Sequence, residues 1–434
     1  MDNILRKIKK LIPRKIFSVL APIYHYKLAL LGAFIYGFPS KDIKVVLVTG
    51  TKGKSSTTEF INAMLESAGR KTALLGTIRF KIGEKTWANK FKMTTPGRFF
   101  VQKFLRDAVT AGCEYAILEM SSEAAKQYRH KFIAIDALIF TNISPEHIES
   151  HGSFEKYLNA KLSLAKALEK SNKVGRIVVA NADDPESEKF LAINVPVKVS
   201  FKLEDAKPFE LTETGSTFTL FGQQMHTVLP GKFNLYNILA AANYAYTQGV
   251  STERIKIAVE HLDEIKGRVQ KIQAGQDFTV VVDYAHTADS LKNLYEAFPN
   301  SQKICVLGNC GGGRDTWKRP EMARIADTYC DEIILTDEDP YDDNPEQIIE
   351  EMRVAIEKKP VLVIMDRRVA IHTAIERARI LEKNNKNQNG SGKVAVLISG
   401  KGTDPYIMRK NGTKEPWSDA TVAEEELKKS VRTK

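Results

Sequence analysis

The chain has 434 residues, of which 43% are hydrophobic and 27% are charged. This balance is that of an ordinary soluble globular protein with two or three domains, and it excludes a low-complexity chain. Lys and Arg outnumber Asp and Glu by 64 to 53, which gives a net charge of +11. That sign suits anionic ligands such as nucleotides, phosphosugars, nucleic acid or acidic lipid, although a need for solubility explains it equally well.

The N-terminal segment, residues 1–43, alternates apolar and basic residues at helical spacing. The apolar positions are Ile4, Leu5, Ile8, Leu11, Ile12, Ile16, Val19, Leu20 and Ile23, and the basic ones are Arg6, Lys7, Lys9, Lys10, Arg14 and Lys15. A basic face opposite an apolar face suits an anionic membrane, so we expect residues 1–40 to contact one. A helical pair packed on the next domain is the alternative. Because Pro22, His25 and Lys27 interrupt the apolar run, a transmembrane span is not expected, and neither is a removed signal peptide.

The four cysteines stand at positions 113, 305, 310 and 330, and none forms a C-x-x-C pair. A zinc ribbon is therefore not expected. Cys113, Cys305 and Cys330 lie in or beside apolar runs, so we expect them to be buried thiols. This usage favours a reducing, cytoplasmic location, with peripheral contact on the inner face of the membrane.

Residues 44–265 are predicted to form a central α/β domain. A β-branched run at 44–49 ends in a Gly-rich turn and is followed by a helical stretch at 55–68. Further buried strands are expected at 116–119, 137–141 and 176–181, which predicts a parallel sheet whose strand C-terminal ends carry the active site. The segment 197–230 is expected to be antiparallel, and an Ala-rich helix is expected at 234–248.

Residues 266–434 are predicted to form a second α/β domain, with strands at 278–283, 303–308, 332–336, 361–365 and 394–399. The expected fold class is therefore a central P-loop ATPase-like parallel-sheet domain followed by a C-terminal Rossmann-like α/β domain.

The first motif that carries chemistry is TGTKGKSS at residues 49–56. A strand runs into a Gly-rich turn, and a lysine and a serine open the next helix. Backbone N–H groups at such a turn cradle phosphates, while the lysine reaches the β- and γ-phosphates and the hydroxyl coordinates Mg²⁺. The spacing lacks the first glycine of the full P-loop, so the motif predicts ATP binding but no particular reaction.

The same string resembles the ATP loop of the Mur ligases and folylpolyglutamate synthases, with Lys52 where Asn is usual. Further strings of that family follow: LEMSS at 118–122, TNISPEH at 141–147 and HGSFEKYLNAK at 151–161. The resemblance implies ATP-phosphate contacts from Gly50, Thr51, Lys52, Gly53, Lys54, Ser55 and Ser56. It also implies Mg²⁺ ligands at Ser55, Glu119 and His147, and a carbamylated lysine at Lys161 that supplies an anionic oxygen to the metal.

Other positions match the family's substrate and nucleotide contacts. The resemblance implies that the acceptor substrate is bound by Thr94, Thr95, Ser121, Ser122 and Arg129. Glu123 stands where stem-peptide ligases have His, so this chain departs from the family's substrate-binding pattern at that position. Asn181, Asn234 and Asn237 would support the nucleotide, although an Asn pair at a helix start also has a plain capping explanation.

The second domain continues the resemblance, which covers residues 44–425. It carries GR at 267–268, VDYAHTAD at 282–289, LGNCGGGRD at 307–315 and KRP at 318–320. These strings imply that Arg268 reaches the ATP phosphates and that Asp283 holds the ribose with His286 nearby.

The segment expected to bind the incoming amino acid departs from the diaminopimelate-adding type. Asp339 replaces Asn and Tyr341 replaces the Arg that grips a carboxylate, while Gly400 and Asp404 stand in SGKGTD at 399–404. A more acidic pocket favours a cationic amino acid, lysine or ornithine. A second departure is that only residues 1–43 precede the first strand, where the family carries a uridine-binding domain, so the uridine contact must be absent, supplied elsewhere or replaced by a lipid-linked substrate.

The predicted function is that of an ATP-dependent ligase which adds an amino acid to a muramyl-peptide carboxylate through an acyl phosphate. One alternative is a related ligase acting on a lipid-linked or polyglutamate-type acceptor. Another is a P-loop NTPase that binds nucleic acid, but it leaves His147, Lys161 and the 282–289 string without a purpose, so no nucleic-acid partner is expected. A catalytically silent binding protein is disfavoured because every expected metal and phosphate residue is present.

Overall fold

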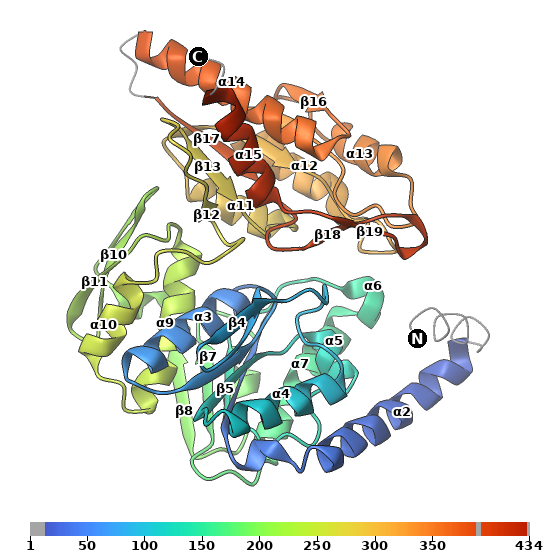
Figure 1. The fold of residues 1–434 in the computed structure, drawn as a ribbon, viewed down its shortest axis with the longest axis vertical. Helices are drawn as coiled ribbons and strands as arrows, with labels where there is room; N and C mark the ends of the chain where they lie inside the picture. Colours follow the sequence, from blue (N-terminus) through green and yellow to red (C-terminus); the bar gives the residue numbers. More distant parts are fainter. Residues whose placement is uncertain (1–13, 388–391, 432–434) are drawn as a thin grey trace. The chain divides into compact units, whose positions relative to one another are not determined.

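The computed structural model describes residues 14–387 and 392–431, which divide into two compact units. We call them the central unit (residues 14–144, 155–201 and 243–248) and the C-terminal unit (residues 145–154, 202–242 and 249–431). Each contains one large, mainly parallel sheet covered by helices (Figure 1). The predicted α/β fold class is thereby confirmed.

The central unit is built on an eight-stranded sheet in the order β4-β3-β2-β5-β1-β6-β7-β8. All neighbours from β2 to β8 pair in parallel, and β3 and β4 add an antiparallel edge. The strands are β1 (Lys44–Thr49), β2 (Thr72–Leu75), β3 (Arg79–Ile82), β4 (Lys85–Ala88), β5 (Tyr115–Glu119), β6 (Ala137–Phe140), β7 (Ile177–Asn181) and β8 (Val197–Phe201). The helices are α2 (Arg14–Ile35), α3 (Lys54–Ser67), α4 (Arg98–Thr110), α5 (Ser122–Lys126), α7 (Phe154–Glu169) and α8 (Ser187–Leu191), with a short 3-10 turn η1 (Pro39–Lys41).

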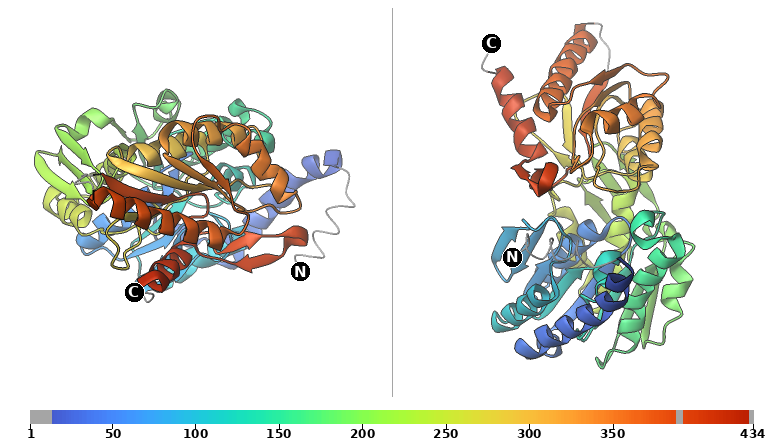
Figure 2. Two further views of the ribbon diagram at one scale, coloured as in Figure 1. Left: turned by 90° about the horizontal axis from the view of Figure 1, so that it is seen from above. Right: turned by 90° about the vertical axis from the view of Figure 1, so that its right-hand side faces the viewer.

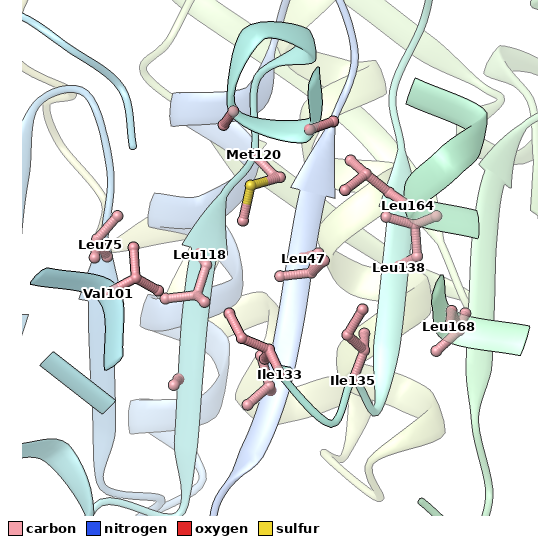
Figure 3. Close-up of a cluster of buried hydrophobic side chains, with 14 of the residues drawn as sticks. Leu47, Leu75, Val101, Leu118, Met120, Ile133, Ile135, Leu138, Leu164 and Leu168 are labelled. Atoms are coloured by element: carbon pink, nitrogen blue, oxygen red, sulfur yellow. The ribbon is translucent and has the colours of Figure 1, made fainter. Parts of the chain in front are cut away.

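Apolar residues pointing to one face of this sheet hold α4 and α7 against it. Leu47, Leu118 and Leu138 lie side by side on β1, β5 and β6, and Val101 of α4 and Leu164 of α7 pack on them (Figure 3). All five side chains are fully buried. The strand register places the C-terminal ends of β1, β5 and β6 beside one another, because Val48 pairs with Glu119 and Thr49 with Phe140. The packing of α4 and α7 holds them there.

Residues 14–35 form one continuous helix, α2, through Pro22, so the described part of the N-terminal segment does not show the helical pair that was the alternative to membrane contact. The apolar and basic positions 4–12 lie outside the described residues. The helix runs along α4 in both views (Figures 1 and 2). Over the described ranges of the chain, no helix combines the length and apolar character that crossing a membrane needs.

The C-terminal unit contains a six-stranded sheet in the order β12-β13-β17-β14-β15-β16, which is parallel except for β12. Its strands are β12 (Gln270–Lys271), β13 (Thr279–Val282), β14 (Ser301–Leu307), β15 (Glu332–Leu335), β16 (Val361–Val363) and β17 (Lys393–Ile398). The helices around it are α11 (Ala288–Glu296), α12 (Lys318–Tyr329), α13 (Pro345–Arg353), α14 (Arg367–Asn387) and α15 (Asp419–Val431). A two-stranded ribbon, β18 (Tyr406–Met408) with β19 (Lys414–Pro416), precedes α15.

The same unit includes an antiparallel sheet of β9 (Phe209–Thr212), β10 (Gly215–Leu220) and β11 (Gln223–Thr227). It is followed by α9 (Lys232–Thr247), whose residues 243–247 are grouped with the central unit, and by α10 (Thr252–Glu260). The predicted antiparallel region is thus confirmed for β9–β11. It is wrong for β8, which pairs in parallel with β7 and extends the central sheet.

The expectation for the cysteines is wrong at two positions. Cys305 and Cys330, which lie on β14 and at the end of α12, are joined in a disulfide. Their Cα atoms are 6.1 Å apart, within the range that a disulfide spans without backbone movement. Cys113 is a buried free thiol, as expected, and burial raises its pKa.

Candidate active site

The phosphate loop lies where β1 meets α3. Gly50 has a φ of 153°, and a Cβ placed on it would come 1.9 Å from Oγ1 of Thr141, so the loop accepts only glycine there. Gly53, with a φ of 82°, caps α3, whose first residue is Lys54. The turn therefore presents backbone N–H groups and the positive end of a helix dipole to the space above β1, an arrangement that suits phosphate.

Side chains from the segment after β6 hold this loop in shape. Oγ1 of Thr51 accepts the N–H of Ser144 at 3.0 Å and lies 2.9 Å from the hydroxyl of Tyr157. The Lys52 N–H donates to Oδ1 of Asn142 at 2.9 Å, and Nζ of Lys54 donates to the carbonyl oxygens of Gly50 and Thr51 at 3.1 and 3.0 Å. The Lys54 ammonium is thus held over the loop, where it can meet a phosphate.

Glu119 lies at the C-terminal end of β5 with only 1% of its surface exposed. Its Oε2 accepts the hydroxyl of Ser55 at 3.1 Å, and its two oxygens accept the N–H and hydroxyl of Thr77 at 2.8 and 2.9 Å. A hydroxyl and a carboxylate beside a phosphate loop are the oxygen ligands that Mg²⁺ prefers. Thr77 was not predicted from the sequence. The one feature of the sequence that points to this contact is the preceding Gly76, because a Cβ placed there would come 2.4 Å from Oε1 of Glu119.

Lys161 lies on α7 and is 1% exposed. Its Nζ donates to the carbonyl oxygen of Gly50 at 2.7 Å and stands 4.8 Å from the centre of the Tyr157 ring. The helix thus delivers a buried lysine to the phosphate loop rather than to solvent. A carbamate on this nitrogen would be an oxygen donor on the same loop, so the residues present fit the proposed group.

The residues expected to bind the acceptor lie close to the end of β5. Oγ1 of Thr95 donates to the carbonyl oxygen of Glu119 at 2.7 Å, and the hydroxyls of Thr94 and Thr77 are 3.0 Å apart. The Arg129 guanidinium donates to the carbonyl oxygen of Thr95. Ser121 caps α5 by accepting the N–H of Ala124 at 3.1 Å, and Ser122 beside it is buried.

The three asparagines expected at the nucleotide are buried, and each makes hydrogen bonds within the protein. Nδ2 of Asn181 donates to the carbonyl oxygen of Thr141 at 2.9 Å, which ties the ends of β6 and β7. In the first turns of α9, Asn234 donates to the carbonyl oxygen of Pro230 at 2.8 Å and accepts from Asn237 at 3.3 Å. These contacts give the asparagines a structural role in stabilising turns and strand ends.

In the C-terminal unit, Asp283 organises the segment that carries Arg268. Its Oδ2 accepts the N–H of Val269 and its Oδ1 that of Ala285, both at 2.7 Å. The Arg268 guanidinium lies 4.5 Å from the centre of the Tyr284 ring and donates to the carbonyl oxygen of Gly267 at 2.9 Å. Gly267 must be glycine, because its Cβ would come 2.7 Å from the backbone of Gly402.

His147 takes a left-handed conformation, with a φ of 58°, at the start of the short helix α6 (Ile148–His151). Asp315 accepts its backbone N–H at 2.8 Å and that of Glu149 at 3.1 Å. Burial alone would raise the pKa of Asp315, but these N–H donors and Lys318, 3.3 Å away, lower it. The preceding Glu146 accepts from Nε2 of His286 at 3.0 Å. Asp315 was not predicted as a site residue, although it belongs to the GGGRD string.

The segment expected to bind the amino acid is acidic, but most of its carboxylates are already paired. Oδ1 of Asp339 accepts from Nζ of Lys401 at 2.9 Å and from the N–H of Met408 at 2.8 Å, and Asp404 lies 3.7 Å from the same ammonium. The remaining pairs are Asp337 with Arg409 and, at 3.8 Å, Asp343 with Arg319. The sequence pattern alone did not reveal these internal partners.

Glu338 is the exception in this cluster. Its Oε1 accepts from Sγ of Cys310 at 3.1 Å, whereas its buried Oε2 has no hydrogen-bond partner among the described residues. Burial raises the pKa of Glu338, and the Arg367 guanidinium opposes that shift. A Cβ on Gly400 would come 2.2 Å from Oε2, so glycine there leaves room for the carboxylate. Nearby, the Arg314 guanidinium stands 5.7 Å from the centre of the Tyr341 ring and donates to its hydroxyl at 3.2 Å.

Comparison with known proteins agrees with this geometry. Residues 48–245 match the model of the Mur ligase middle domain, and residues 267–402 match that of the Mur ligase, glutamate ligase domain. The chain therefore belongs to the Mur ligase family and is an ATP-dependent amide-bond ligase.

Its relatives are of the tripeptide-synthetase type. It is 35% identical over 404 residues to the UDP-N-acetylmuramoyl-L-alanyl-D-glutamate–2,6-diaminopimelate ligase of Halalkalibacterium halodurans, covering 91% of this chain and 80% of that one. It is 37% identical over 431 residues to the UDP-N-acetylmuramyl-tripeptide synthetase of Roseiflexus sp. strain RS-1, covering 92% and 81%.

Solved structures give the same result. A diaminopimelate ligase structure matches with a TM-score of 0.60 at 28% identity, over 90% of this chain and 79% of that one. Mycobacterium tuberculosis folylpolyglutamate synthase complexed with ADP matches with a TM-score of 0.67, over 87% and 92% of the two chains, but at 14% identity, so this likeness concerns the fold alone.

Proposed function

We propose that this ligase adds an amino acid to the free carboxylate of a muramyl peptide during peptidoglycan precursor synthesis. The carboxylate would attack the γ-phosphate of ATP to give an acyl phosphate and ADP. The amine of the amino acid would then attack the acyl carbon, form the amide and release phosphate. The observation that carries the proposal is the convergence of Ser55, Glu119 and Lys161 on one glycine-rich phosphate loop, in a chain whose relatives are muramyl-peptide ligases.

We assign the phosphates of ATP to the loop from Gly50 to Ser56 and to Arg268, and the ribose to Asp283 with His286 nearby. Bound Mg²⁺ would neutralise charge that develops on the transferred phosphoryl group. Ser55, Glu119, His147 and a carbamate on Lys161 would hold it. The ammonium of Lys54 would stabilise the same charge from the loop.

We assign the muramyl peptide to Thr94, Thr95, Ser121, Ser122 and Arg129. Hydroxyls and a guanidinium near the end of β5 suit its amide and carboxylate groups. Since Thr95 and Arg129 also bond to the backbone of this region, they would shape the acceptor site as well as contact the substrate.

We propose lysine or ornithine as the incoming amino acid, although several relatives are named for diaminopimelate. Tyr341 stands where an arginine would grip a second carboxylate, and a tyrosine cannot make that bidentate contact. The contacts of Asp339 and Asp404 with Lys401 leave Glu338 as the carboxylate best placed to accept a side-chain ammonium. The positions Asp339, Tyr341, Gly400 and Asp404 would shape the pocket around it.

A ligation screen tests the reaction. The full chain would be incubated with ATP, Mg²⁺ and each of several amino acids, using uridine-linked and lipid-linked muramyl dipeptides as acceptors. We expect ADP and an amide product of matching mass in equal amounts, and no product with the Lys54→Ala variant. ATP hydrolysis that requires DNA or RNA and no amino acid would instead identify a nucleic-acid-dependent NTPase.

We further propose that the enzyme works in the cytoplasm, where ATP and nucleotide-linked precursors are present, and that residues 1–40 contact the inner face of the membrane. The basic residues of this segment support the contact, because anionic lipids attract them. Co-sedimentation of the full chain with anionic vesicles tests it, and binding should weaken as salt is added.

A further inference from the structure

The described part of α2 buries its small residues and exposes its large ones. Ala29, Gly32 and Ala33 are buried, and a Cβ placed on Gly32 would be 3.6 Å from Cα of Phe99 on α4. The exposed apolar side chains of the helix are Ile23 (53%), Tyr24 (55%), Tyr26 (45%), Leu30 (41%), Leu31 (48%), Phe34 (72%) and Ile35 (57%). A helix that only covered its own domain would turn the large residues inward.

These exposed residues form one continuous face. Positions 23, 30, 31 and 34 follow the three- and four-residue spacing of a helix, and position 27 between them carries a lysine. Single exposed apolar residues are common on a protein surface, whereas a contiguous row of this length marks a surface that binds something apolar. We call the exposed residues from Ile23 to Ile35 the outer face of α2.

Contacts with the rest of the central unit hold α2 in this orientation. Arg98 lies 2.5 Å from Nδ1 of His25, the rings of Tyr26 and Phe132 are 5.0 Å apart, and Arg106 donates to the carbonyl oxygens of Tyr36 and Gly37 at 2.9 and 3.0 Å. The helix is therefore already ordered. Binding of a partner to its outer face would lose little conformational entropy.

Charge decides which apolar partner fits. From residue 3 to residue 41 the sequence contains eight Lys and Arg residues and no Asp or Glu. A second copy of the chain would bring two such cationic segments together, which Coulomb repulsion disfavours. An anionic lipid surface offers an apolar interior for the outer face and negative headgroups for the cations.

We propose that the outer face of α2 inserts into the interfacial layer of an anionic bilayer, with the helix lying in the membrane plane. Leu30, Leu31 and Phe34 enter the acyl region, and Tyr24 and Tyr26 lie at headgroup depth, where amphipathic rings are favoured. The proposal rests on the membrane contact proposed for residues 1–40 and identifies the residues that insert. It does not depend on the ligase chemistry.

The test compares full-length proteins in a vesicle flotation assay. The Leu30→Glu/Phe34→Glu double variant removes two apolar anchors, and the matched control, Val174→Glu/Ile257→Glu, adds the same two charges at other exposed apolar positions. With vesicles of phosphatidylglycerol and phosphatidylcholine we expect at least a tenfold weaker partition coefficient for the first variant and a change of less than threefold for the control. Both variants should keep the thermal midpoint of the unaltered chain, which shows that they are folded.

Each other outcome overturns a distinct statement. Equal vesicle binding by the unaltered chain and the Leu30→Glu/Phe34→Glu variant would show that the outer face does not insert, while leaving the membrane contact of residues 1–40 in place. Equal binding to purely zwitterionic vesicles would remove the role of charge. No binding of the unaltered chain to any vesicle would overturn the membrane contact as well. A lipid-free dimer that the double variant abolishes would identify a second copy as the partner.

Discussion

Nζ of Lys161 donates a 2.7 Å hydrogen bond to the carbonyl oxygen of Gly50, so a buried lysine from α7 reaches the first glycine of the phosphate loop. The same carbonyl oxygen accepts from Nζ of Lys54 at 3.1 Å. A helix lysine that looks like any other in the sequence is therefore part of the loop that meets ATP.

Replacing Lys161 should remove most ligase activity. We expect Lys161→Ala to lower kcat by at least about a hundredfold, because the loss of a preorganised charged group at a phosphoryl-transfer site has an effect of that order. If the functional form is a carbamate, a short carboxylic acid such as acetate should restore part of the rate. Lys166→Ala, an exposed lysine on the same helix, is the control. Near-full turnover by Lys161→Ala would exclude the carbamate.

Asp315 should act by positioning His147. Loss of its carboxylate frees two backbone N–H groups and releases a left-handed residue from its restraint. We expect Asp315→Ala to lower kcat by roughly tenfold to a hundredfold, because small displacements of a catalytic group have costs of this size. Asp315→Asn, which retains one acceptor oxygen, should lose less.

The readout that separates positioning by Asp315 from a loss of stability is metal affinity. Mn²⁺ binding in the presence of a non-hydrolysable ATP analogue should weaken in Asp315→Ala. The control is Glu321→Gln on α12, for which we expect an unchanged thermal midpoint. Unaltered Mn²⁺ affinity in Asp315→Ala would show that the aspartate does not act through His147.

Amino-acid choice should depend on position 341. With one acceptor we expect lysine or ornithine to exceed diaminopimelate in kcat/KM by roughly a hundredfold, the discrimination set by one missing bidentate pair. Tyr341→Arg should shift this ratio toward diaminopimelate, and Glu338→Gln should reduce the use of lysine. Direct competition between the amino acids, resolved by product mass, measures the ratio. A clear preference of the unaltered enzyme for diaminopimelate would mean that another arginine, such as Arg314, provides the clamp.

His130 should make the protein lose stability in acid. The side chain is 2% exposed, neither ring nitrogen has a hydrogen-bond partner among the residues that the structure describes, and burial followed by the charge of Lys131 lowers its pKa to about 3. The unfolded value is about 6.5, so between these values the unfolded chain binds a proton that the folded chain does not. The stability that the protein gains from keeping His130 neutral is therefore complete above about pH 6.5. As the pH drops toward 3, the free energy of unfolding falls by up to about 1.4 kcal/mol per pH unit because of this residue.

Urea unfolding at pH 7 and pH 5 measures this effect. The free energy of unfolding should fall by about 2 kcal/mol less in His130→Leu than in the unaltered chain, since only the latter carries the titrating imidazole. His226→Leu, at an exposed position, should behave like the unaltered chain. The same loss between pH 7 and pH 5 in His130→Leu would show that His130 is protonated in the folded state as readily as in the unfolded one.

The sequence predicted those parts of the molecule that depend on local pattern. The β-branched run of β1 and the glycines after it specify a strand, a turn and a helix within about 25 residues, and the loop with Lys54 and Ser55 follows from them. The parallel sheets follow from the alternation of strands and helices. β8 was assigned to the wrong pairing, because its polar alternation matches an exposed edge strand of either kind.

What the sequence did not predict depends on partners distant in the chain. The acidic run around Asp339 suggests a cation-binding pocket, but Lys401 lies 62 positions further on and neutralises that carboxylate. The bond from Thr77 to Glu119 spans 42 positions, and that between Asp315 and His147 spans 168. The disulfide between Cys305 and Cys330 likewise depends on how α12 packs against β14, which no spacing rule specifies.

The outer face of α2 also has a consequence for the colloidal behaviour of the purified enzyme. At low ionic strength the cationic N-terminal segments keep molecules apart, while at about 1 M salt the Debye length falls to roughly 3 Å and this repulsion is lost. Sulfate and phosphate salts strengthen the association of the exposed apolar rows at the same time. The protein should therefore remain monodisperse in dilute buffer or mild detergent and precipitate at modest concentrations of ammonium sulfate.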